Sequence, residues 1–139
     1  MRNVTISKKA LHRERGVMSF NHQNAGWSRL VNVESNIIPK GTSISEVSLC
    51  SLDEEIDEKI TFIKMDVEGA EMDALMGTKR TIQRHRPKLA ISLYHKISDI
   101  WEIPALIHHY VPTYKLYIRH HALWTTPACM SEVVLYAVE

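Results

Sequence analysis

The sequence predicts one α/β domain built on a mostly parallel sheet. At 139 residues, the chain is long enough for one compact domain and too short for two. Its composition, 45% hydrophobic and 24% charged residues, is typical of a globular protein. From residue 60 onward, strand-like and helix-like patterns follow one another as strand, helix, strand, helix, strand, strand. This order is typical of βαβ units, whose crossovers are right-handed.

The first 50 residues predict short strands around one long loop. Apolar and polar residues alternate over 4–11, as in a half-exposed strand. Gly16 indicates a turn, and 17–20 is a second strand candidate. Residues 21–45 are rich in Asn, Ser, Gly and Pro, which predicts a long irregular loop. A further strand is expected over 46–50.

A short helix and a strong strand are expected next. Ser51 has the residue type of an N-cap, and Glu54 stands three positions later. This spacing predicts a capping box at the start of a helix over 51–56. Residues 60–65 are largely apolar and predict a strand that ends at Asp66.

From Gly69 the apolar period becomes helical. The residues at helical spacing are Met72, Leu75, Met76, Lys79 and Ile82. Glu71 and Asp73 suit the positive end of the helix dipole, and we expect both to be solvated. Gly77 is expected to split the helix, and Pro87 to end it.

The remaining elements complete the predicted sheet. Residues 89–94 are nearly all apolar, which suits a central strand covered on both faces. A helix is expected over 98–110, with Pro104 early in it, where a missing N–H costs least. Two last strands are expected over 114–118 and 133–138, joined by a loop.

Candidate chemistry lies at strand ends, because open α/β sheets bind ligands beyond the carboxyl ends of their strands. Asp66 and Glu68 follow the first central strand, His95 the second, and Arg119 and His120 the third. If the first two strands are neighbours, about 4.8 Å apart, Asp66 and His95 face one crevice. A histidine beside a carboxylate is a candidate general base.

Other interpretations of these residues remain open. Asp66 and Glu68 precede a helix and could simply cap it. His95 could be an ordinary polar residue after a buried strand. Asp66, His95 and His120 could together bind the divalent metal of a hydrolase. Trp27 and Trp101 could line a substrate pocket or belong to the core.

Composition argues against several classes of protein. A formal net charge of +1 gives no electrostatic case for binding nucleic acid or a membrane surface. No apolar run reaches the roughly 20 residues that span a bilayer, and the N-terminus does not resemble a signal peptide. Cys50 and Cys129 have no CxxC spacing and are expected to be reduced thiols. The sequence therefore predicts a cytoplasmic protein.

Residues 63–71, Ile-Lys-Met-Asp-Val-Glu-Gly-Ala-Glu, carry a family resemblance. They resemble the KxDxEGxE signature of FkbM-type S-adenosylmethionine-dependent methyltransferases. The similarity continues at residues 52–53, 87–95, 103–104, 114–120 and 132–137. It covers nearly the whole chain and is most specific over 60–138.

The resemblance implies a Rossmann-like class I methyltransferase fold. Such enzymes move a methyl group from S-adenosylmethionine, usually to a hydroxyl, and their acceptors include sugars and other small metabolites. The implied catalytic residues are Asp66, Glu68 and His95. The implied cofactor-binding residues are Ala10, Leu11 and Asp66. The implied substrate-binding residues are Arg119, His120 and Trp27. No metal ligand is assigned, and whether a metal takes part stays open.

The chain departs from the family pattern at its beginning. Family members open with a strand, a glycine-rich turn and a second strand ending in an acid. The five glycines here include no GxG pair. We therefore expect 1–139 to be a single partial domain, truncated at the N-terminus, that binds S-adenosylmethionine weakly or not at all. A non-catalytic remnant or interaction module of the same fold is the alternative.

The same departure affects the sheet. In the complete fold, the missing first strand would lie beside the strand over 60–65. Without it, we expect the strand over 60–65 to be an exposed edge of the sheet. Exposed edges invite pairing with another chain, so we expect self-association.

Overall fold

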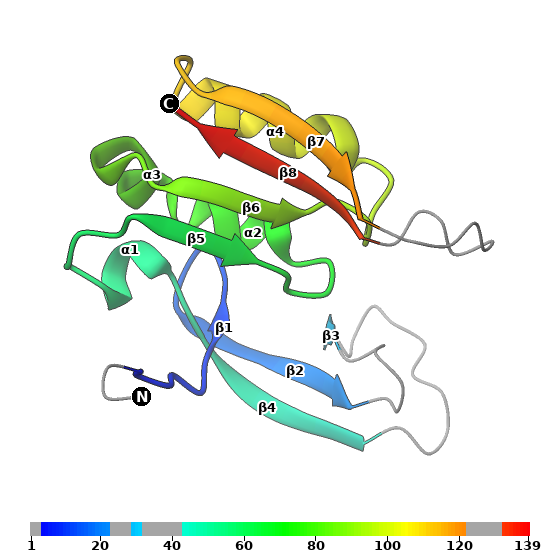
Figure 1. Ribbon diagram of the computed structural model, residues 1–139. Helices are drawn as coiled ribbons and strands as arrows, with labels where there is room; N and C mark the ends of the chain where they lie inside the picture. The colour runs from blue at the N-terminus through cyan, green and yellow to red at the C-terminus, as the bar shows by residue number, and fades with distance from the viewer. Residues whose placement is uncertain (1–3, 23–28, 32–42, 122–131) are drawn as a thin grey trace.

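The strands form two four-stranded sheets in the computed structural model, which describes residues 4–22, 29–31, 43–121 and 132–139 (Figure 1). One sheet is built from the N-terminal part of the chain and the other from the C-terminal part. Helices follow the first two strands of the second sheet in sequence. The predicted α/β class is confirmed, with the strands divided between two sheets.

The N-terminal sheet has the strand order β1 (Ala10–Leu11), β4 (Ser43–Cys50), β2 (Gly16–His22) and β3 (Arg29–Val31). β1 is parallel to β4, and β2 is antiparallel to both of its neighbours. The strands predicted over 17–20 and 46–50 are confirmed, and both are longer than expected.

Two expectations for this region are wrong. Only the last two residues of 4–11 form a strand, because residues 4–9 are exposed and have no strand partner in the described part of the chain. The loop expected over 21–45 is shorter than predicted, because β2 includes its first residues and β4 its last. β3 lies between them. The long antiparallel β2–β4 pairing extends both strands.

The C-terminal sheet has the strand order β5 (Phe62–Met65), β6 (Lys88–Ser92), β8 (Val133–Val138) and β7 (Lys115–His120). Only β5 and β6 pair in parallel, so the expected mostly parallel hydrogen bonding is wrong. The last strand causes the difference, because β8 lies between β6 and β7 and is antiparallel to both. β5, β6 and β7 still run in one direction.

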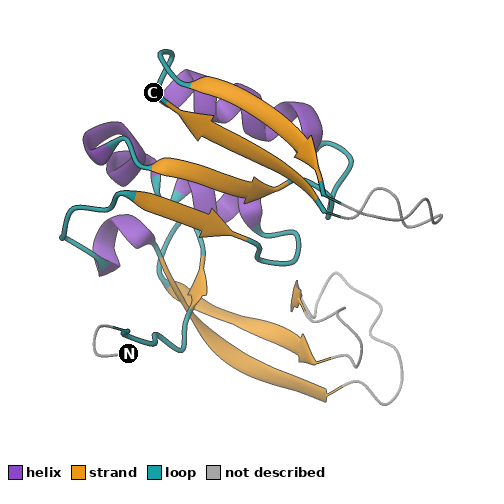
Figure 2. Ribbon diagram, viewed as in Figure 1, coloured by secondary structure: helices purple, strands orange, loops and turns teal. Residues whose placement is uncertain are grey.

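Helices α2 (Glu71–Met76), α3 (Lys79–His85) and α4 (Asp99–Tyr110) lie on one face of this sheet (Figure 2). The predicted split at Gly77 is confirmed, and α3 ends before Pro87. Pro104 is the sixth residue of α4, so the expectation that it lies in the first turn is wrong. None of the helices in the described residues is long and apolar enough to cross a membrane.

Helix α1 (Leu52–Glu55) follows Ser51 as predicted, but the expected capping box does not form. The Ser51 side chain makes no capping hydrogen bond. The neighbouring Asp53 caps α3 instead, since its carboxylate accepts the backbone N–H groups of Arg80 and Thr81, both at 2.8 Å. An acid from α1 therefore satisfies donors in the first turn of α3.

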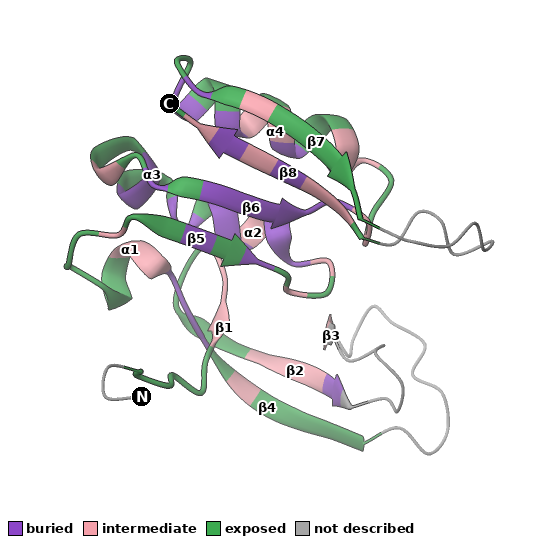
Figure 3. Cartoon of the chain, in the orientation of Figure 1, coloured by how far each residue is buried: buried purple, intermediate pink, exposed green. Residues whose placement is uncertain are grey.

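The core lies between the C-terminal sheet and its helices. Register places Ile63 beside Leu89 and Met65 beside Ile91, on the face that the helices cover. β6 is buried along almost all of its length (Figure 3), which confirms the prediction of a central strand. Burying an aliphatic side chain of this size stabilises the fold by about 1.5–3 kcal/mol. The core thus fixes the carboxyl ends of β5 and β6 next to each other.

Candidate active site

The carboxyl ends of β5 and β6 bring two predicted residues together. Asp66 directly follows β5, and His95 comes shortly after β6. The two strands are parallel neighbours, with Met65 opposite Ile91. His95 Nε2 lies 3.7 Å from Asp66 Oδ1, which confirms the expected closeness of these side chains. Their catalytic roles stay a prediction.

The turn between β5 and α2 directs Glu68 toward the same histidine. Glu68 and Gly69 have left-handed backbones, with φ of 54° and 91°. A Cβ at position 69 would find ordinary contacts 3.6–3.7 Å away, so conformation rather than space favours glycine there. Glu68 Oε2 lies 3.3 Å from His95 Nε2. The N-cap of α2 is Ala70, so neither Asp66 nor Glu68 occupies the capping position.

Glu71 is a site residue that sequence reasoning missed. It was expected to be solvated, but its side chain is fully buried. Its Oε1 accepts the Val67 N–H at 3.0 Å and lies 2.8 Å from His95 Nδ1. A signal existed, because Glu71 has helical spacing to Ala74 and Leu75, both fully buried. The buried face of α2 therefore includes its first residue.

The charges around His95 shift two pKa values in opposite directions. Burial alone would lower the pKa of His95, but Glu71, Glu68 and Asp66 outweigh it and raise that pKa above its ordinary value. Burial alone would raise the pKa of Glu71, but His95 and the Val67 N–H lower it below its ordinary value. The site therefore favours a protonated His95 beside an ionised Glu71.

Two further side chains lie close to the Asp66 carboxylate. The Tyr94 hydroxyl donates a hydrogen bond to Asp66 Oδ1 at 3.0 Å, and Lys64 Nζ lies 3.6 Å from Asp66 Oδ2. Burial, followed by the bond to Asp66, raises the pKa of Tyr94 to about 12. Tyr94 therefore stays protonated near neutral pH and acts as a donor to Asp66.

A first cavity of about 460 Å³ opens beside His95. Its polar lining includes Glu68 and His95. The remaining lining residues are His12, Met18, Leu30, Val31, Gly69, Ala70, Asp73 and Lys96. Met18, Leu30 and Val31 belong to the N-terminal sheet, which therefore supplies one wall of the cavity.

A second cavity of about 630 Å³ is also lined by Glu68. Ala10 and Leu11, the residues expected near the cofactor, line it together with Val67. Asp66, the third residue of that expected set, is not among its lining residues. Leu30, Glu68 and Ala70 line both cavities, so the two share a wall next to His95. Two adjoining cavities of this size suit two small-molecule ligands that react with each other.

The residues expected to bind substrate are not part of this arrangement. Arg119 and His120 are exposed at the end of β7, two strands away from β6, and line neither cavity. The sequence could not show that β8 would insert between β6 and β7. Trp101 is 58% exposed on α4 and also lines neither cavity. Trp27 lies outside the described residues.

The alternative metal trio with His120 is also wrong. Among the described residues, the group whose ligand atoms all lie within 4.8 Å of one another is Asp66, Glu71 and His95. His120 is separated from that group by the width of β8 and β6. A hydrolase centre built from Asp66, His95 and His120 therefore does not form.

Comparisons with known proteins identify the family of this chain. A family model described as the methyltransferase FkbM domain matches residues 9–121. The chain is similar to a crystal structure of methyltransferase FkbM from Methylobacillus flagellatus KT, at 28% identity and a TM-score of 0.70. That match covers 96% of this chain and 28% of the other, so this chain spans little more than a quarter of that protein. No match is found among proteins of curated function.

Proposed function

Because the chain belongs to the FkbM methyltransferase family, we propose that it takes part in transferring a methyl group from S-adenosylmethionine to a hydroxyl of a small molecule or glycan. The observation that carries the proposal is the position of His95 and Glu68. His95 lines the first cavity, and Glu68 forms part of the wall between the two cavities. Methyl transfer needs donor and acceptor sites that meet beside a base.

The second cavity suits the cofactor. Its volume of about 630 Å³ lies within the usual range for small-molecule sites. Ala10, Leu11 and Val67 supply apolar surface for an adenine ring, and the Glu68 carboxylate suits a cation. When bound, S-adenosylmethionine supplies an electrophilic methyl group on a positively charged sulfur. The Glu68 carboxylate would stabilise that charge in a partly buried site.

The first cavity suits the acceptor, because His95 lines it. In the proposed reaction, the acceptor hydroxyl gives its proton to His95 while its oxygen forms a bond to the methyl carbon. The methyl group would come from the bound cofactor, whose sulfur would keep the electrons of the bond that breaks, and His95 would hold the proton that the hydroxyl loses. The raised pKa of His95 supports this role, because a base works best when its pKa is near the working pH.

Calorimetric titration with S-adenosylmethionine tests the proposal. We expect weak binding, because the five glycines of this sequence include no GxG pair of the kind that lets backbone approach the cofactor. Glu68→Gln should weaken binding about tenfold, whereas Glu102→Gln, an exposed residue of α4, should leave it unchanged. If the chain gives no binding heat at millimolar cofactor, the proposed function fails and the non-catalytic alternative is favoured.

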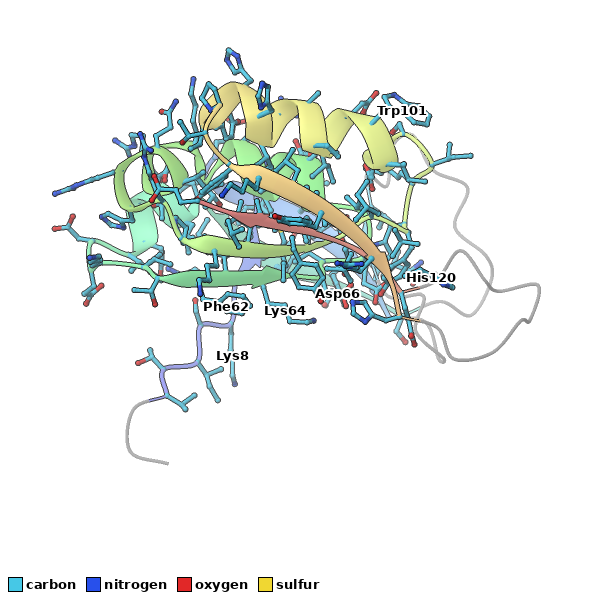
Figure 4. All side chains as sticks on the ribbon, turned by 45° about the horizontal axis from the view of Figure 1, so that its top comes forward. Lys8, Phe62, Lys64, Asp66, Trp101 and His120 are labelled. Atoms are coloured by element: carbon cyan, nitrogen blue, oxygen red, sulfur yellow. The ribbon has the colours of Figure 1, made fainter. Side chains whose placement is uncertain are left out.

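Self-association is the second part of the proposal. β5 is an end strand of its sheet and pairs on one side only within the described residues. Its Phe62 side chain is 56% exposed, on the side away from the helices (Figure 4). An apolar edge of this kind favours pairing with a second chain, and we propose that this occurs in the cytoplasm. Light scattering that shows only monomer at high concentration would exclude it.

A further inference from the structure

Glu71 is a buried carboxylate in the first turn of α2. Its side chain is fully buried. Burying an ionised carboxylate costs several kcal/mol before its partners compensate. Oε1 accepts the Val67 N–H and lies 2.8 Å from His95 Nδ1 as an ion pair, whereas Oε2 is buried without a hydrogen-bond partner in the described residues. Such a costly arrangement is typical of a functional site.

The two nitrogens of His95 face different surroundings. Nδ1 lies 2.8 Å from Glu71 Oε1, inside the protein. Nε2 lies 3.3 Å from Glu68 and 3.7 Å from Asp66, on the side where Glu68 lines the cavities. Only Nε2 can therefore take a proton from a methyl acceptor. Nδ1 lies against the buried carboxylate of Glu71.

Glu71 also holds the ring in place. Its Oε1 is fixed by the Val67 N–H, which comes from the same turn that positions Glu68. A carboxylate fixed in this way keeps a proton on Nδ1, which leaves Nε2 as the site that gains and loses a proton. The imidazole then has one neutral tautomer and one orientation.

Other charged groups around the ring do not offer Nδ1 a competing partner. Asp66 and Glu68 face Nε2 from the turn after β5. Asp99 of α4 is buried and interacts with both Glu71 and His95 through charge alone. Tyr94 lies against the ring with its centroid 4.2 Å away, and Lys96 is the next residue along the chain.

We propose that Glu71 is a positioning residue, which fixes His95 as the Nδ1–H tautomer and makes Nε2 the atom that accepts the hydroxyl proton. The inference rests on the proposed methyl transfer for its catalytic meaning. The tautomer itself does not depend on that reaction. Removing the carboxylate should therefore change the histidine even in the absence of any substrate.

The test is nitrogen-15 NMR of the full chain labelled at histidine, with His95→Gln used to assign the His95 signals. Wild-type His95, once neutral, should carry its proton on Nδ1. Glu71→Gln should lower the pKa of His95 and move the neutral proton to Nε2, because the amide can donate to Nδ1. Glu71→Asp should keep part of both effects, and Glu102→Gln should change neither.

The outcomes separate this inference from the proposed function. A wild-type neutral His95 with its proton on Nε2 would overturn the inference, and this result needs no variant that folds. An unchanged His95 pKa in folded Glu71→Gln would also overturn it. If the NMR results agree but methyl transfer is absent, the proposed function alone fails. Where transfer is measurable, Glu71→Gln should lower kcat about 10²–10⁴-fold with little change in KM.

Discussion

Replacing Gly77 by alanine should destabilise the protein strongly, for a reason of space and not of backbone conformation. Gly77 has φ of −77°, which any residue adopts. A Cβ there would lie 2.0 Å from the His12 carbonyl oxygen and 3.0 Å from Ser51 Cβ. The oxygen would have to retreat by about 1 Å to reach even the tightest contacts that real Cβ atoms make. The backbone of 10–12 would therefore have to move.

The cost follows from what that backbone holds. Overpacking against a rigid neighbour costs about 1–3 kcal/mol. Moving His12 also strains the 2.8 Å hydrogen bond that its backbone N–H donates to the Cys50 carbonyl. A hydrogen bond of this kind stabilises the fold by about 1 kcal/mol. Alanine also reduces the conformational entropy of the unfolded chain, which stabilises the variant by about 0.4–1 kcal/mol. The net loss is about 1–3.6 kcal/mol of the free energy of unfolding.

Urea denaturation of the wild type, of Gly77→Ala and of a control variant, Gly16→Ala, measures this loss. At a typical slope of about 1–3 kcal/mol per molar urea, the midpoint of Gly77→Ala should fall by about 1–2 M. Gly16→Ala is the matched control, because its new Cβ would be 3.7 Å from Leu49 and should shift the midpoint little. Equal midpoints for the two variants would refute the reasoning from close approach.

Three further predictions concern the cap, the charged pair and the sheet edge. Asp53→Ala should lower the free energy of unfolding by about 0.5–2 kcal/mol, since α3 loses its N-terminal cap; an unchanged thermal midpoint would contradict this. The Glu71–His95 pair should stabilise the fold most between pH 4.5 and 6.5, the ordinary values of the two groups. Its contribution should be lost below that window as Glu71 protonates and above it as His95 deprotonates, so urea midpoints of Glu71→Gln should vary less with pH than those of the wild type. Phe62→Lys should reduce self-association in light scattering without changing cofactor binding, and equal association would argue against the β5 edge.

Local patterns predicted the part of the site that depends on neighbouring parallel strands. Asp66 and His95 follow two apolar strands, and adjacency of those strands was enough to bring the side chains together. Glu71 was missed because an acid in the first turn of a helix is usually solvated. Its burial depends on His95, which is 24 residues away in sequence and which no local pattern links to it.

Sheet order was the other feature that local patterns could not supply. Arg119 and His120 end a strand, as expected, but the position of that strand depends on where β8 inserts. Likewise, Ser51 had the correct local pattern for a capping box, yet Asp53 provides the cap, to a different helix. Long-range packing decided each of these cases.

The wall shared by the two cavities has a thermodynamic consequence. Leu30, Glu68 and Ala70 border both spaces, so a ligand that orders Glu68 from one side reshapes the surface met by a ligand on the other. We expect the two binding equilibria to be linked, each ligand changing the affinity of the other by the same factor. A cation in the second cavity should draw Glu68 away from His95 and free Nε2, so that filling the second cavity prepares the first.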